Sequence, residues 1–234
     1  MPYVICSPST EIYAKQIALN LHSTKIIVVN GRLRDDVKYG TFDDVVIGIG
    51  GGSVIDYAKI VSGKRTSIAV PTTASGANMT SHAVVWGEEK KDIETRIPLT
   101  LPLYELWNIK LSEEVLDDTF IDCICHCFET LLNENAGKVS SNYARKGLKY
   151  LGLFLDTKFI NYLIKAGNYG GQAIELIPTS IIHKPSYEYT LRGLSHGRAL
   201  KKVLIDKGYS SCLNRRNLYT DIVQSPLISY TLDI

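Results

Sequence analysis

A run of apolar residues that ends in three glycines constrains this chain more than any other feature. The segment VVIGIGGGSVIDYAKIV covers residues 45–61, and residues 45–49 contain no polar residue. A run of this kind is typical of a strand covered on both faces, as in parallel α/β sheets. Apolar residues then recur at helical spacing from Val54 to Val61. The segment predicts a buried strand, a glycine turn at residues 50–53 and a helix.

The glycine turn has two interpretations. Glycines allow a ligand to approach the backbone closely, and the N–H groups and dipole at a helix N-terminus favour an anion, most often a phosphate. The alternative is a tight turn that only lets the helix pack well on the strand. The run Gly50, Gly51, Gly52 and Ser53 in this context favours phosphate binding.

Short strands alternate with helical segments up to about residue 108, which predicts an α/β region with a parallel sheet. The predicted strands are residues 3–6, 25–30, 45–49, 67–70 and 81–86, with a helix at 9–22. The charged residues 87–96 predict a solvated loop or a hairpin.

The remainder of the chain is predicted to be helical. Helical patterns begin at Leu111, with breaks expected at 133–137 and at 169–171. We therefore expect two domains, residues 1–108 and 109–234. The segment from Ser210 has weak periodicity and receives no assignment.

Composition excludes several classes of protein. The 234 residues are 45% hydrophobic and 21% charged with a net charge of +2, as in ordinary globular chains without a nucleic-acid partner. No apolar stretch is long enough to span a membrane, and residues 1–15 do not have the pattern of a signal peptide. The five cysteines show no CxxC spacing, so we expect a reducing, cytoplasmic location.

A second candidate site lies in the helical region. Asp122 and His126 are four residues apart, so on a helix they project from one face, and Glu129 adds a third polar group. A carboxylate and an imidazole at this spacing form a common half-site for a divalent metal. The alternative is an exposed helix face with a hydrogen-bonded Asp–His pair.

Two further histidines complete a candidate metal site. His183 follows an apolar stretch, and His196 precedes a glycine and a helical pattern. Either could be a buried histidine with ordinary partners. Together with Asp122 and His126 they offer one oxygen and three nitrogen ligands, which suits Fe(II) or Zn(II).

Four motifs, in the same order, resemble the iron-dependent alcohol dehydrogenases and the related dehydroquinate synthases. GIGGGSVIDYAK resembles the GGGSxxDxAK turn of that superfamily, and VPTTASGANMTS resembles its PTTxGTGSE segment. DCICHCFE is similar to its D-x3-H-x2-E helix, and His183 with SHG is similar to its later histidines. The chain is shorter than most members.

The resemblance implies a Rossmann-like, dinucleotide-binding α/β domain followed by a helical metal-binding domain. It implies an oxidoreductase that transfers a hydride between an alcohol or aldehyde, polyol or sugar-derived, and NAD or NADP. Its metal would be held by Asp122, His126, His183 and His196. Its candidate cofactor residues are Gly50, Gly51, Gly52, Ser53, Asp56, Lys59, Thr72 and Thr73. Tyr187 stands where members often carry another histidine, and we count it as a candidate catalytic residue.

Two other functions stay open at this point. One is a lyase like dehydroquinate synthase, although its ligand set usually begins with glutamate rather than with Asp122. The other is a shortened, non-catalytic homologue. The motifs do not distinguish iron from zinc or identify the substrate, and a homo-oligomer is one alternative for the assembly.

The residues after the second strand predict the choice of cofactor. An acidic residue there usually binds the ribose 2′-OH of NAD, whereas an arginine accommodates the 2′-phosphate of NADP. This chain has Asn30, Gly31 and Arg32 at that place. We expect NADP to be used at least as well as NAD, as measured by kcat/KM with each cofactor, and a strong preference for NAD would contradict this.

Overall fold

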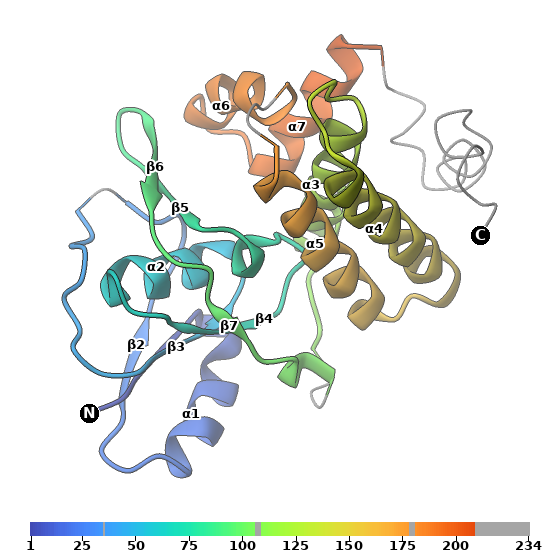
Figure 1. The fold of residues 1–234 in the computed structure, drawn as a ribbon. Helices are drawn as coiled ribbons and strands as arrows, with labels where there is room; N and C mark the ends of the chain where they lie inside the picture. The colour runs from blue at the N-terminus through green and yellow to red at the C-terminus, as the bar shows by residue number, and fades with distance from the viewer. Residues whose placement is uncertain (35, 106–108, 178–180, 209–234) are drawn as a thin grey trace. The chain divides into compact units, whose positions relative to one another are not determined.

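The computed structural model describes residues 1–34, 36–105, 109–177 and 181–208 (Figure 1). The chain divides into two compact units, one of Met1–Lys110 and one that begins at Leu111. Within the described ranges, no helix is both long and apolar enough to cross a membrane.

The first unit contains a five-stranded parallel sheet with the order β2-β1-β3-β4-β7. The strands are β1 (Tyr3–Cys6), β2 (Lys25–Val28), β3 (Val46–Gly50), β4 (Ile68–Pro71) and β7 (Leu99–Thr100). The order reverses between β1 and β3, as in doubly wound folds. In such sheets, ligands bind beyond the carboxyl ends of the strands at this reversal point.

Helices on the two faces of the sheet explain why β3 lacks polar residues. Helix α1 (Glu11–Leu19) packs on one face with Val4 and Ile49, and α2 (Gly52–Ser62) packs on the other with Ile5 and Val46. Figure 1 shows the two helices on opposite sides of the strands. Because both sides of β3 are covered, all five of its residues are buried.

The charged residues after β5 form a hairpin. Strands β5 (His82–Trp86) and β6 (Lys90–Glu94) pair in antiparallel fashion as a separate two-stranded sheet. The described residues of the first unit also form three short 3-10 helices, at Pro8–Thr10, Ala77–Met79 and Leu103–Glu105. The edge strand β7 was not predicted, because its two residues are too short to produce a pattern.

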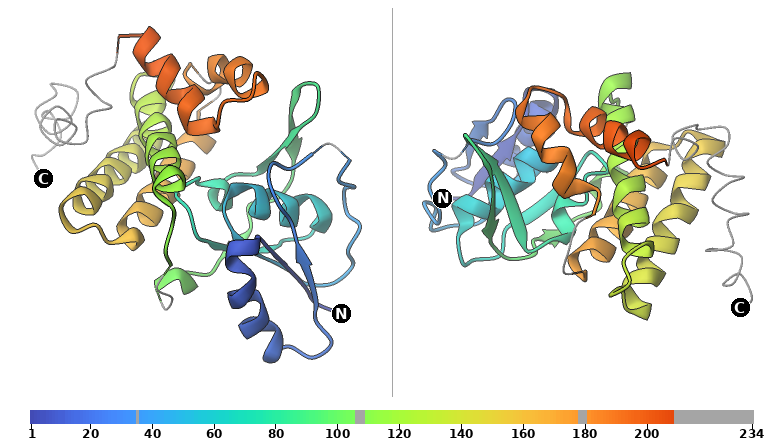
Figure 2. Two further views of the ribbon diagram at one scale, coloured as in Figure 1. Left: turned by 180° about the vertical axis from the view of Figure 1, so that it is seen from behind. Right: turned by 90° about the horizontal axis from the view of Figure 1, so that it is seen from above.

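The second unit is helical. Up to residue 208 and apart from residues 178–180, its helices are α3 (Glu113–Leu131), α4 (Lys138–Thr157), α5 (Ile160–Glu175), α6 (His183–Leu191) and α7 (His196–Asp206). Ser112 caps the start of α3, where its hydroxyl accepts a hydrogen bond from the Val115 N–H at 3.4 Å. Figure 2 shows α4 and α5 side by side, and both contact α3.

The helix break predicted at residues 169–171 is wrong. Helix α5 runs through Gly170 and Gly171, and the break lies instead at Lys158, which has a left-handed backbone (φ 60°) and ends α4. Gly170 is used for packing: a Cβ atom on it would lie 3.2 Å from Cβ of His126. Glycine inside a helix therefore marks a close approach between helices here, rather than an end.

Gly147 allows a similarly close approach between α4 and α3. A Cβ atom there would lie 2.6 Å from Sγ of Cys127, which is fully buried on α3. Gly147→Ala should therefore lower the free energy of unfolding by about 1–3 kcal/mol, in the range of overpacked cores. Urea unfolding measures this.

The matched control removes the sulfur atom that the new methyl group would meet. If the clash is the cause, adding Cys127→Ala should recover part of the lost stability, giving a coupling energy of about 0.5 kcal/mol or more in a double-mutant cycle. Purely additive effects would contradict the packing argument.

Candidate functional site

One face of α3 carries the central groups of the candidate metal site. Asp122 and His126 lie one helical turn apart, and the His126 Nε2 atom is 3.6 Å from Oδ1 of Asp122. Both residues are buried, with 7% and 9% of their surfaces exposed. The interpretation of this pair as an exposed helix face is therefore wrong.

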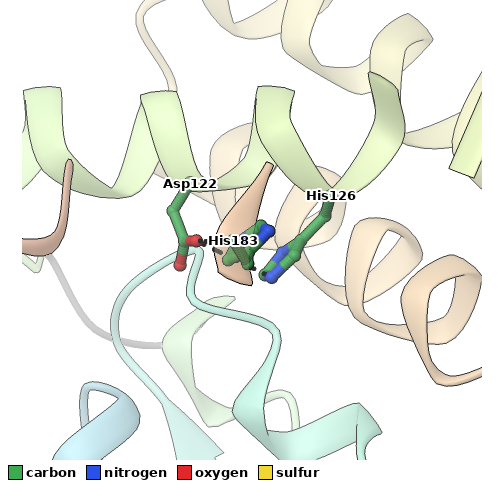
Figure 3. Close-up of side chains that lie close together, drawn as sticks. All are labelled: Asp122, His126 and His183. Carbon is green, nitrogen blue, oxygen red and sulfur yellow. Dashed lines mark hydrogen bonds and ion pairs between the residues drawn. The ribbon is translucent and has the colours of Figure 1, made fainter. Parts of the chain in front are cut away.

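The two later histidines reach the same carboxylate oxygen from other helices. His183, the first residue of α6, has its Nε2 atom 3.1 Å from Oδ1 of Asp122. His196, the first residue of α7, has its Nε2 atom 3.4 Å from it. Figure 3 shows the side chains of Asp122, His126 and His183 converging from α3 and from the separate segment of His183. Three imidazole nitrogens thus face one oxygen.

The glycine after His196 allows α7 to begin close to α3. A Cβ atom on Gly197 would lie 2.4 Å from Cα of Asp118, so any side chain there would push α7 away. Ser195 caps α7 and donates a hydrogen bond from its hydroxyl to Oδ1 of Asp118 at 3.1 Å. The SHG motif therefore has a local packing reason, which the sequence analysis did not identify.

The distances match those expected around a transition metal. Ligands about 2.1 Å from a tetrahedral metal lie about 3.4 Å from one another. The three Nε2 atoms lie 3.6, 3.1 and 3.4 Å from Oδ1 of Asp122. The ligand atoms of Asp122, His126 and His183 all lie within 4.8 Å of one another, and His196, with its side chain 35% exposed, lies beside this group. The donor set fits Fe(II) or Zn(II).

Burial and neighbouring charges shift the pKa values of the site residues in different directions. Burial lowers the pKa of His126 to about 4, so this ring is neutral at pH 7 and offers a lone pair. Burial acts on His183 as well, but hydrogen bonds to Asp122 and Glu129 raise its pKa to about 9. Burial opposes the charge of Asp122, yet the neighbouring histidines hold its pKa well below the usual range. The result is a buried anion surrounded by imidazoles.

The glycine turn lies at the reversal point of the sheet. Gly50 ends β3, and Gly51 is the N-cap of α2. The segment after β4 packs against it: the Thr72 N–H donates to the Gly50 carbonyl at 2.9 Å, and a Cβ on Gly51 would lie 3.2 Å from Oγ1 of Thr73. The first N–H groups of α2 have no acceptor within the helix, as at any helix start, so they suit an anion.

Asp56 and Lys59 are engaged inside the protein. They form a buried ion pair, with Lys59 Nζ 2.9 Å from Oδ1 of Asp56. Lys59 also donates to the carbonyls of Ala77 and His82, and Asp56 accepts from the Val84 N–H. The two residues therefore hold α2 to the hairpin, and the partners of their side chains are other groups of the first unit.

A hollow of about 190 Å³ lies beside the glycine turn. It is lined by the predicted residues Asn30, Arg32 and Ser53, and the Arg32 guanidinium lies 5.5 Å from the centre of the Trp86 ring. Arg34 and Asp36 also line it, and both were missed by sequence reasoning. Their only signal was their place shortly after the second strand.

A family described as iron-containing alcohol dehydrogenase matches residues 13–103, which lie in the first unit and stop before α3. None of the curated proteins compared with the chain matches it in sequence.

Several solved structures share the fold. An iron-containing alcohol dehydrogenase from Corynebacterium glutamicum is 17% identical with a TM-score of 0.75, over 94% of this chain and 70% of that one. One from Thermotoga maritima is 17% identical with a TM-score of 0.71, over 98% and 77%. A maleylacetate reductase from Agrobacterium tumefaciens is 15% identical with a TM-score of 0.71, over 94% and 71%.

The predicted resemblance to the iron-containing alcohol dehydrogenases is therefore confirmed. It holds in sequence for residues 13–103 and in fold for most of the chain. The predicted fold class, a parallel α/β region followed by a helical region, is confirmed as well. The chain covers 70–77% of the length of these proteins.

The convergence on Asp122 can be tested by the metal content of two variants. His126→Ala removes one nitrogen of the buried group and should lower the amount of Fe(II) or Zn(II) bound. His82→Ala is the control, because His82 is an exposed residue of β5 in the first unit, and it should keep its metal. Elemental analysis after dialysis measures both, and equal metal content would contradict the assignment.

Proposed function

We propose that this protein is a metal-dependent oxidoreductase that transfers a hydride between an alcohol and NAD or NADP. The observation that carries the proposal is the set of three imidazole Nε2 atoms within 3.6 Å of the Asp122 carboxylate oxygen. The similarity to iron-containing alcohol dehydrogenases and to a maleylacetate reductase supports an oxidoreductase.

In this proposal Asp122, His126, His183 and His196 are the metal ligands. A divalent metal held there would act as a Lewis acid on the alcohol oxygen, and the nicotinamide would accept the hydride. Asp122 supplies a negative charge that attracts the cation, and the neutral ring of His126 supplies a lone pair. His183 must give up a proton to bind the metal, because its pKa in the metal-free protein is about 9.

The first unit would bind the cofactor. The glycine turn at the start of α2 would hold the pyrophosphate, with Thr72 and Thr73 behind it. The hollow beside it would receive the adenosine ribose, and Arg32 and Arg34 there favour the 2′-phosphate of NADP. Asp36 is the carboxylate in the same hollow that could bind the 2′-OH of NAD instead. Asp56 and Lys59 would contribute indirectly, because their contacts hold α2, the helix that begins at the turn, against the hairpin.

Tyr187 remains the candidate for a further contact to the substrate. It lies one turn after His183 on α6 and is half-buried. A phenol hydroxyl at this place would suit a substrate with a second hydroxyl or an acid group, such as a polyol or a sugar-derived alcohol. Its proposed role is to orient the substrate.

The direct test is an assay for NAD(P)H formation with alcohols, polyols and sugar acids, in the presence of Fe(II) or Zn(II). Two variants should affect cofactor binding and metal binding separately. Gly51→Val places a branched side chain at the phosphate turn, so cofactor affinity should fall at least tenfold while metal content is kept. His126→Ala should lower the metal content and keep the cofactor affinity.

Gly137→Val is the matched control for the turn. Gly137 is also an N-cap with extended backbone (φ −74°, ψ 168°), close to that of Gly51 (φ −79°, ψ −173°), but nothing lies within 4 Å of its Cβ position. It should keep the cofactor affinity, measured by fluorescence titration with NADPH. If Gly51→Val binds NADPH as tightly as Gly137→Val, the turn does not hold the pyrophosphate.

A further inference from the structure

Glu129 is a buried carboxylate that stands behind the candidate metal ligands. Its side chain has no exposed surface. One oxygen, Oε2, lies 2.5 Å from Nδ1 of His183, and the other, Oε1, accepts a hydrogen bond from the Ile182 N–H at 2.8 Å. A buried carboxylate is costly unless it is paired and hydrogen-bonded, so these contacts are what permits it at this position.

The two contacts determine how the His183 ring is presented. The ring has two nitrogens, and the one that carries the proton is set by the hydrogen bond that the other makes. Because Glu129 accepts only, Nδ1 of His183 must carry a proton, which leaves Nε2 to face Oδ1 of Asp122 at 3.1 Å. The bond to Ile182 fixes the backbone immediately before the histidine.

We propose that Glu129 is a positioning residue for the metal site, which holds the Nδ1 side of the His183 ring so that Nε2 is the atom that faces the other ligands. Glu129 lies on the same helix as Asp122 and His126, three residues after His126. One helix therefore carries two ligands together with the group that orients a third ligand from α6. This inference rests on the proposed metal site.

Glu129→Gln is the sharpest variant, because it keeps the size of the side chain and removes its charge. If the new amide donates to Nδ1 of His183, the ring must carry its proton on Nε2, the atom proposed to bind the metal. If the amide turns the other way, the Ile182 N–H loses its acceptor. In either orientation the arrangement that presents Nε2 is weakened.

The experiment compares Zn(II) affinity in the wild type, Glu129→Gln and Thr130→Val by competition with a chromogenic chelator. Metal affinity should fall about 10- to 100-fold in Glu129→Gln, as for other residues that orient metal ligands. Thr130 is the matched control: it is the next residue, equally buried, and its hydroxyl donates to the His126 carbonyl within the helix at 2.9 Å. Thr130→Val should bind Zn(II) as the wild type does.

A second measurement needs no variant and covers the case in which Glu129→Gln does not fold. In the Zn(II)-loaded wild type, the imidazole ¹⁵N spectrum should show His183 with a proton on Nδ1 and the metal on Nε2. Metal on Nδ1, or a folded Glu129→Gln with wild-type affinity, would overturn the role of Glu129 alone. A wild-type protein that binds no Zn(II) or Fe(II) would overturn the proposed metal site as well.

Discussion

The buried carboxylate of Asp122 is the group on which the second unit is organised. A charge removed from water costs several kcal/mol unless other groups stabilise it, and here the stabilising groups are imidazoles from three helices. The starts of α6 and α7 must therefore lie against the middle of α3. An apolar cluster that includes Cys125, Ile182 and Leu200 packs beside the polar group and holds the same helices together. Hydrophobic packing brings the helices close together. The charge of Asp122 favours the arrangement in which His183 and His196 face it.

Glycine has two different uses in this chain. In the first unit it ends β3 and begins α2, where a bare backbone suits the approach of a phosphate. In the second unit, Gly147, Gly170 and Gly197 remove side chains where helices would otherwise collide with Cys127, His126 or Asp118. The two uses cannot be distinguished by residue type alone, which is why the glycines at 170 and 171 were interpreted wrongly as a helix end.

Sequence reasoning worked best where a pattern is local. Strand β1 has the predicted bounds, β3 and β4 differ from prediction by one residue, and the charged segment after β5 is one of the two alternatives given for it. It failed where the pattern is short or the cause is distant. Strand β7 has two residues, and Asp36 enters the hollow beside Arg32 through the course of a loop. Glu129 was noticed as a polar group on the right helix face, but its partner His183 is 54 residues away.

By itself, the sequence determined the types of element, their order and the residues able to bind a metal or a phosphate. The reason is that strand burial, helical spacing and ligand chemistry can all be recognised from residues close together in the sequence. Only the tertiary structure decided that Asp122 and His126 are buried and that three imidazoles meet one carboxylate oxygen. It also decided that Asp56 and Lys59 pair with each other and with the hairpin. The physical reason is that solvation and pairing of a charge depend on what the rest of the chain places around it, and that environment comes from segments distant in sequence.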